Sequence, residues 1–203
     1  MRPNDMSIMS MIILGVLFLA NTSAQCTDQY TELFIHSDTF NGSTIFEDSS
    51  DSKHLISISG NPRHSTERAK FGATSIYFDG DDYLLIGDPD DLNSFTGPYT
   101  VDFWILQTVN VFGNRSFDRW TGGYCDFTLQ IENDSARLLV DNAADNTYDV
   151  DIRASVSLSD QNWHHIAIVR STDITTIYID GVAKAATSPS NVYDILTALK
   201  VSI

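Results

Sequence analysis

The chain has 203 residues, of which 42% are hydrophobic, 11% aromatic and 19% charged, a composition typical of a folded globular protein and not of a disordered one. Its formal net charge is −15. Phosphate backbones and anionic lipid surfaces are bound through clustered lysine and arginine, so this acidity argues against nucleic acid and against an anionic membrane surface as partners.

The N-terminal residues have the pattern of an export signal. Arg2 precedes an apolar run over 8–20, and Thr22-Ser23-Ala24 offers small residues for cleavage after Ala24. The run has 13 residues, too few to cross a hydrocarbon core of about 30 Å as a helix. Residues 1–24 are therefore predicted to be a signal peptide, with an uncleaved anchor as the alternative. Residues 25–203 are predicted to be one secreted domain that does not insert into a membrane.

From Thr74 onward, apolar residues recur mostly at every second position, which is the period of a β-strand whose one face is buried. The predicted strands are Ser75–Phe78, Tyr83–Ile86, Tyr99–Leu106, Phe127–Glu132, Ala136–Asp141, Tyr148–Ile152, His164–Arg170, Thr176–Ile179 and Leu199–Ile203. Asp79-Gly80 and Asp180-Gly181 supply the positive φ angles of tight hairpin turns. This pattern predicts an all-β protein built as a two-sheet antiparallel sandwich.

Two parts of the chain fit this pattern less well. Residues 25–70 show no clear alternation, and the polar stretch 47–53 is predicted to be a solvated loop. The last segment, Leu199–Ile203, alternates like a strand but is followed by neither a turn nor a partner. An open apolar edge favours association, so we expect either that the sandwich lacks its final strand or that another chain supplies it.

Three segments together resemble a known family. They are Thr74–Ile86, Phe95–Ile105, and Asn162–Arg170 followed by Thr176–Gly181. Their order and residues resemble the laminin G-like jelly rolls of the concanavalin A-like lectin/glucanase superfamily, over roughly residues 70–203. The resemblance implies a jelly-roll sandwich to which residues 25–70 add the first strand or two. It also implies a carbohydrate-binding or protein-adhesion module.

The superfamily also contains laminarinase-type glycosidases, which present two carboxylates on one strand face. Retaining hydrolysis needs those carboxyl groups about 5 Å apart. The nearest candidate is Glu132-Asn133-Asp134, which lacks the second glutamate. We therefore expect a strand that ends in a turn at this position and no catalysis.

Acidic residues are concentrated in two short loops. The first holds Asp79, Asp81 and Asp82, and the second holds Asp88, Asp90 and Asp91. Calcium takes six to eight oxygen ligands, so these loops are candidate calcium sites, with Asp79, Asp81 and Asp82 as the preferred ligands. The alternative is a pair of ordinary turns in which aspartate accepts hydrogen bonds from its own backbone.

Ligand contact is expected in the segment 112–124, which we predict to be a loop. Sugars stack on exposed aromatic rings and bind to flanking polar groups, which points to Arg119, Trp120 and Tyr124. Alternatively, Trp120 folds back over the core. Trp104 and Trp163 are predicted to belong to the core itself.

The histidine and cysteine residues allow two further predictions. His164 and His165 are adjacent on a strand, so their side chains face opposite ways and do not share a metal ion. Cys26 and Cys125 are the two cysteines, and in an oxidising compartment they can form a disulfide. Asn41, Asn114 and Asn133 begin glycosylation sequons, which are used only in a eukaryotic host.

The sequence thus predicts a secreted, non-catalytic recognition module. Its expected ligand is a glycan or glycoconjugate, bound through rim loops with calcium as a candidate cofactor. One alternative is a module for adhesion to, or assembly with, an extracellular protein. A second alternative is a diverged glycoside hydrolase.

Overall fold

The structure is a computed structural model built from β-strands. It describes residues 7–10, 29–87, 98–109, 115–121, 124–132, 134–141, 148–171, 174–187 and 200–202. Within these ranges, the side chains of residues 7–10, 119–121, 124–126 and 200–202 are left out of the description. The described residues contain no helix, and every strand pairing among them is antiparallel.

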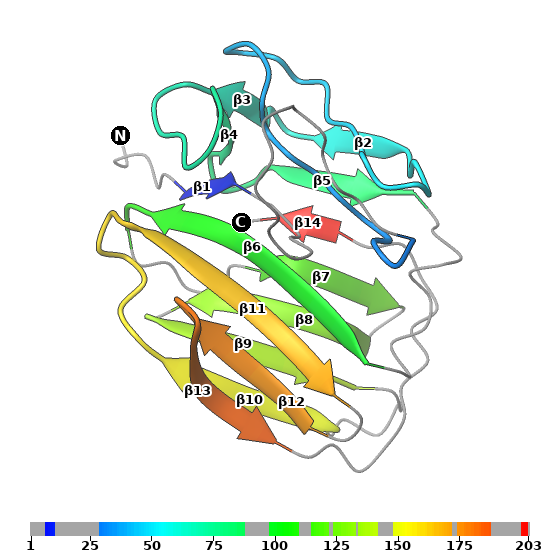
Figure 1. Ribbon diagram of the computed structural model, residues 1–203, viewed down its shortest axis with the longest axis vertical. Coiled ribbons are helices and arrows are strands. Elements are labelled where there is room, and N and C mark those ends of the chain that lie inside the picture. The colour runs from blue at the N-terminus through cyan, green and yellow to red at the C-terminus, as the bar shows by residue number, and fades with distance from the viewer. Residues whose placement is uncertain are drawn as a thin grey trace.

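Two seven-stranded sheets form the fold (Figure 1). The first sheet runs in the order β13 (Val182–Thr187), β12 (Ile174–Ile179), β11 (Trp163–Ser171), β6 (Tyr99–Gln107), β1 (Ser7–Ser10), β4 (Ser75–Phe78) and β3 (Arg63–Ser65). The second sheet runs in the order β10 (Val150–Ser155), β9 (Ser135–Val140), β8 (Tyr124–Glu132), β7 (Arg115–Thr121), β14 (Lys200–Ser202), β5 (Tyr83–Ile86) and β2 (Ile56–Ser59). The predicted two-sheet antiparallel jelly-roll sandwich is confirmed.

One apolar core lies between the sheets. Phe103, from the first sheet, packs against Phe117, from the second, with ring centroids 5.3 Å apart. In β8, the apolar positions Phe127, Leu129 and Ile131 all belong to this core, as the alternation of the sequence predicts. Burial of these side chains on the inner faces of both sheets is what holds the sandwich together.

Five strands lie outside the strand ranges predicted from the sequence. β2 and β3 supply the first strands expected from residues 25–70, but they are short and mostly polar. β13 is an edge strand whose side chains are largely exposed, so no buried alternation marks it. β7 lies within the predicted loop 112–124, and β1 lies within the predicted signal peptide.

The expectation that the last predicted strand has no partner is wrong for β14. Its residues pair with β5 on one side and with β7 on the other. β14 is therefore an interior strand of the second sheet. Residues 199 and 203 lie outside the described part of the chain.

β1 also occupies the interior of a sheet. It pairs with β4 and β6 on its two sides, and Figure 1 shows it between these strands at the N-terminal end of the chain. The prediction that residues 1–24 are removed as a signal peptide stays a prediction. If they are removed, the first sheet loses this strand.

The assignment of Trp104 to the core is wrong, whereas Trp163 packs against a second hydrophobic cluster outside the core between the sheets. In β6, Phe103 and Ile105 face the core, so Trp104 between them faces outward. Trp163 packs on Tyr77 and Leu106 in a second, smaller apolar cluster. We call Tyr77, Leu106 and Trp163 the outer cluster.

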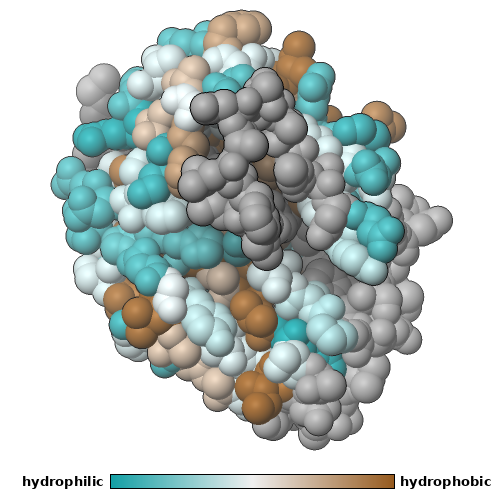
Figure 2. All heavy atoms as spheres, viewed as in Figure 1, coloured by the Kyte–Doolittle hydropathy of each residue, from teal (hydrophilic) through white to brown (hydrophobic). Residues whose placement is uncertain are grey.

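The described surface on the side of the molecule shown in Figure 2 is largely polar. Strongly apolar residues stand apart from one another among polar ones on this side (Figure 2). Scattered exposed apolar residues of this kind are normal for a soluble protein. The described part of this surface thus offers no continuous apolar patch that would indicate a binding site.

Candidate functional site

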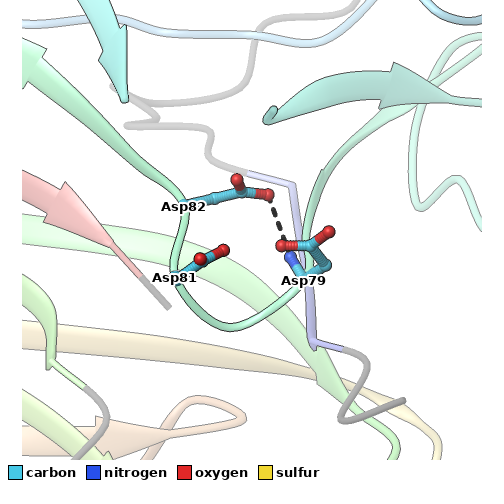
Figure 3. Close-up of side chains that lie close together, drawn as sticks. All are labelled: Asp79, Asp81 and Asp82. Atoms are coloured by element: carbon cyan, nitrogen blue, oxygen red, sulfur yellow. Dashed lines mark hydrogen bonds between the residues drawn. The ribbon is translucent and has the colours of Figure 1, made fainter. Parts of the chain in front are cut away.

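The turn between β4 and β5 brings the three predicted calcium ligands together. The carboxylates of Asp79, Asp81 and Asp82 offer oxygen atoms that all lie within 4.8 Å of one another. Figure 3 shows these three side chains around one tight turn. Gly80, with φ of 113°, allows the backbone to turn this sharply. The predicted convergence of these residues is confirmed, whereas binding of calcium stays a prediction.

Asp82 anchors the cluster. Asp82 is only 2% exposed to solvent. Its carboxylate accepts hydrogen bonds from the backbone N–H of Asn61, at 2.6 Å, and of Asp79, at 3.0 Å. Asp79 also accepts a hydrogen bond from the side-chain amide of Asn61, at 3.0 Å, while Asp79 and Asp81 remain exposed. The turn is therefore tied to the loop that follows β2.

The cluster carries an electrostatic cost. Burial raises the pKa of Asp82, the two backbone hydrogen bonds oppose that shift, and the neighbouring charge of Asp79 raises the pKa further. A bound cation would offset the repulsion between these carboxylates. Three carboxylates do not complete the six to eight oxygens that calcium takes, so backbone carbonyls or water would have to supply the rest. The second acidic loop, with Asp88, Asp90 and Asp91, lies outside the described residues.

The predicted ligand-contact residues Arg119, Trp120 and Tyr124 lie in a strand hairpin and not in a loop. In the pairing of β7 with β8, Trp120 is opposite Cys125 and Thr121 is opposite Tyr124. These positions lie at the C-terminal end of β7 and the N-terminal end of β8. The three side chains, like that of Cys125 and the whole of Cys26, lie outside the described part of the chain, so the ligand contacts and the disulfide stay predictions.

A buried polar group on β7 was not predicted. Asp118 accepts a hydrogen bond from the Thr128 hydroxyl, at 2.7 Å, and pairs with Arg115 at 3.0 Å. Phe117, which precedes Asp118, belongs to the core between the sheets. The alternation of Ser116, Phe117 and Asp118 was the available signal, but polar residues on both sides of one aromatic made the segment look like a loop.

The geometry around Glu132 does not form a pair of catalytic carboxylates. Glu132 is buried and lies 3.4 Å from Arg153. Asp134 turns away to the loop after β10, where it accepts hydrogen bonds from the Ser159 hydroxyl, at 2.7 Å, and the Leu158 N–H, at 3.2 Å. The Ser159 hydrogen bond is the largest of the effects that lower the pKa of Asp134. Asp134 thus stabilises a turn, as the sequence predicts for the end of this strand.

His164 and His165 have separate partners, as the alternation predicts. His165 pairs with Asp102 at 3.1 Å and packs against Trp104, with ring centroids 5.2 Å apart. His164 lies between Asp180, at 2.8 Å, and Asp160, at 3.0 Å. Hydrogen bonds from Asn162 and His164 lower the pKa of Asp160 to about 2, which keeps a negative charge beside His164.

His164 is expected to make stability depend on pH. Burial lowers its pKa, but the hydrogen bonds to Asp180 and Asp160 outweigh burial, so the pKa is raised above 6.5. The stabilisation is therefore complete below pH 6.5 and is lost as pH rises through the higher pKa of the folded state. We expect His164→Gln to remove a stabilisation on the order of half a kcal/mol that the original protein loses above pH 6.5.

Urea unfolding measured from pH 5.5 to 8.5 checks this prediction. His36→Gln is the matched control, because the ring of His36 contacts the Ser49 hydroxyl and forms no ion pair with a carboxylate within the described part of the chain. A His164→Gln profile parallel to that of the original protein would contradict the prediction.

Comparison with known proteins places the chain in a family. A family model described as the concanavalin A-like lectin/glucanases superfamily matches residues 78–201. The chain belongs to this superfamily. This match confirms the family resemblance that the three sequence segments predict. A search of curated protein sequences finds no match.

Several solved structures share the fold. The binding domain of botulinum neurotoxin DC in complex with SialylT has a TM-score of 0.62 and 15% identity, over 80% of this chain and 41% of that one. The same domain in complex with rat synaptotagmin II has a TM-score of 0.61 and 13% identity, over 79% and 42%. A structure of botulinum neurotoxin type C, whose cell entry depends on two ganglioside molecules, has a TM-score of 0.61 and 12% identity, over 80% and 41%.

The superfamily member spans about two fifths of the length of these neurotoxin structures. At such low identity the likeness concerns the fold alone. Within the described residues, no helix is long and apolar enough to cross a membrane.

Proposed function

We propose that this superfamily member is a secreted, non-catalytic module that recognises a glycoconjugate. The observation that carries the proposal is its membership of the concanavalin A-like lectin/glucanase superfamily, over residues 78–201. Two neurotoxin structures that share the fold over part of their length support it: one is a binding domain in complex with SialylT, and the other is of a toxin whose cell entry depends on two ganglioside molecules. The turn-forming role of Asp134 beside Glu132 supports recognition over hydrolysis.

The binding surface proposed for the glycan is the end of the β7–β8 hairpin. In the pairing register Trp120 is opposite Cys125 and Tyr124 is opposite Thr121, and Arg119 precedes Trp120. Aromatic rings stack on the apolar faces of sugar rings, and arginine donates hydrogen bonds to hydroxyl and carboxylate groups of sialylated glycans. We therefore expect this end of the strand pair to offer both kinds of contact.

A glycan array that includes ganglioside oligosaccharides, probed with and without a calcium chelator, tests the proposal. We expect binding to a defined glycan class and a loss of about tenfold in affinity for Trp120→Ala, the scale of one aromatic stacking contact. Phe40→Ala is the control, because Phe40 is an exposed aromatic on another part of the chain. Absence of binding across the array would contradict the proposal.

Calcium is proposed as the cofactor of the turn that holds Asp79, Asp81 and Asp82. At a calcium concentration ten times the dissociation constant, we expect the melting temperature to rise by about 3–6 °C, and Asp81→Asn to abolish the rise. Asp51→Asn, at an exposed acidic residue outside the turn, is the control. If calcium does not change the melting temperature of the original protein, the proposal is contradicted and the cluster is an ordinary acidic turn.

A protein partner is the second candidate function. The complex of the similar neurotoxin domain with rat synaptotagmin II supports it.

A further inference from the structure

One edge of the first sheet is covered by a segment that precedes it in the chain. β3 is the last strand of this sheet, and His64 lies at its centre. The backbone carbonyl of His64 accepts a hydrogen bond from the Gly42 N–H, and the His64 N–H donates to the Ser43 carbonyl, each at 2.8 Å. We call residues 37–46 the docked segment. His64 thus joins the docked segment to the edge of the sheet through its main chain.

The side chain of His64 is buried within the same contact. The residue is 2% exposed, and its ring stacks on the ring of Phe46 with centroids 4.6 Å apart. Nε2 lies 2.8 Å from the Ile45 carbonyl oxygen, and Nδ1 lies 2.5 Å from the Ser37 hydroxyl. Both ring nitrogens are therefore hydrogen-bonded to the docked segment.

The hydrogen bonds around this ring have only one possible direction. A carbonyl can only accept, so Nε2 donates to Ile45 and the neutral ring accepts at Nδ1 from Ser37. The Thr74 hydroxyl lies 3.0 Å from that of Ser37 and accepts from the Thr39 N–H at 3.3 Å. Because the Ser37 proton is directed to His64, Thr74 has to donate to Ser37. The neutral ring therefore satisfies each of these groups.

A proton added at Nδ1 turns the acceptor of this chain into a donor. Ser37 would have to accept from His64 and direct its own proton to Thr74, whose oxygen already accepts from Thr39. Thr74 is 0% exposed, and the hydrogen bonds described for it offer no acceptor for its displaced proton. Protonation would thus bury a charge and leave a buried donor unsatisfied.

The charged surroundings of the ring do not compensate for this cost. The titratable residues of the docked segment, of its two flanking positions, of β3 and β4 and of the loop between these strands are, besides His64, His36, Asp38, Glu47, Arg63, Glu67, Arg68, Lys70 and Tyr77. Within the described residues, no carboxylate forms an ion pair with His64, and the charge that acts on its pKa is that of His36. The carboxylate of Asp38 instead accepts from the Ala73 N–H, at 2.9 Å. In acid the two histidines repel each other.

The direction of the pKa shift agrees with this geometry. Burial lowers the pKa of His64 below 6.5, the hydrogen bond to Ile45 opposes that shift, and the charge of His36 lowers the pKa further. The contact is therefore fully stable above pH 6.5 and is weakened as pH falls from 6.5 through the lower pKa of the folded state. The face of Phe46 offers a charged ring only a weak attraction, which does not replace the lost hydration.

We propose that protonation of His64 detaches the docked segment from β3 and β4, so that this contact is a pH-sensitive switch. Detachment exposes the backbone edge of β3 and the ring of Phe46, which is 7% exposed in the structure. An open strand edge next to an apolar ring favours association with another chain. The switch depends on neither glycan nor calcium, and it opposes the effect of His164, whose stabilisation is complete below pH 6.5.

Amide hydrogen exchange of the full chain, followed by NMR and corrected for the pH dependence of intrinsic exchange, tests the proposal. The probes are the N–H groups of Gly42 and His64, and the references are those of Ile166 and Ile168 in the middle of β11. Between about pH 7.5 and about pH 5, we expect protection at the probes to fall about tenfold, the effect of one buried group left unsatisfied. Protection at the references is expected to stay nearly constant, because the opening is local.

His64→Gln supplies a side chain with one donor and one acceptor that does not titrate, and it is expected to make protection at Gly42 independent of pH. His36→Gln is the matched control and is expected to keep most of the fall, because His64 remains. If His64→Gln does not fold, the difference between probes and references in the original protein still decides.

Three results would overturn the inference. The first is equal protection of Gly42 and His64 at both pH values. The second is an equal fall at probes and references, which would indicate global unfolding. The third is a folded His64→Gln protein that keeps the tenfold fall, which would assign the pH dependence to another group.

Discussion

Replacing Phe103 with alanine is expected to lower the free energy of unfolding by about 3–5 kcal/mol, because the substitution removes buried area and leaves a cavity. Phe103 is 0% exposed and packs on Phe117 between the two sheets. For a domain of this size, each kcal/mol lowers the melting temperature by about 2–4 °C, so a fall of roughly 6–20 °C is expected. Urea unfolding and thermal melting measure the two quantities.

Phe40→Ala is the matched control for that prediction. Phe40 is 68% exposed, so its truncation is expected to change stability by less than about 0.5 kcal/mol. If Phe103→Ala cost less than about 1 kcal/mol, the packing of the two inner faces against each other would be contradicted.

Asp48→Ala is expected to cost a similar amount, about 3–5 kcal/mol, because it removes a buried acceptor shared by several donors. The Asp48 carboxylate accepts hydrogen bonds from the backbone N–H groups of Phe34, Ser50 and His54, each at 2.9 Å. It also contacts the His54 ring at 2.7 Å. Asp51→Ala, at an exposed neighbour, is the control and is expected to be nearly neutral.

The pH dependence of Asp48 gives this prediction a second measurement. Burial alone would raise the pKa of Asp48, but the hydrogen bonds from Phe34, Ser50 and His54 outweigh burial and lower the pKa below 3.8. The stabilisation is therefore present above pH 3.8 and is lost as pH falls through the lower pKa of the folded state. Asp48→Ala should lose stability less steeply in acid than the original protein, and equal acid sensitivity would contradict the assignment.

The sandwich was predictable because its interior strands carry a regular period. Phe127, Leu129 and Ile131 alternate with polar residues, and one face of β8 has to be buried. β13 has Ala183, Lys184 and Ala185 where a buried strand would carry branched or aromatic residues. Such an edge strand is held by pairing with β12 and not by its own apolar pattern, so the sequence contains little local signal for it.

The candidate calcium site was predictable for a different reason. Asp79, Asp81 and Asp82 are neighbours in sequence, so one turn is enough to bring them together. The hydrogen bonds of Asp134 with Ser159 and of Asp48 with Phe34 join residues that are distant in sequence. Only the three-dimensional path of the chain reveals such contacts. Trp104 was misassigned because a large aromatic in a strand fits either face, and the parity of Phe103 and Ile105 decides which.

The turn with the three aspartates is also a crossing point of the chain between the two sheets. β4 belongs to the first sheet and β5 to the second, while the nearby segment that contains Gly60 and Asn61 leads from β2, in the second sheet, to β3, in the first. These two crossings touch so closely that a Cβ atom on Gly60 would lie 2.1 Å from the Asp82 carboxylate. A cation bound there would link the two sheets at one corner. Its release is therefore expected to destabilise the whole sandwich in one cooperative transition, and not only the surface turn.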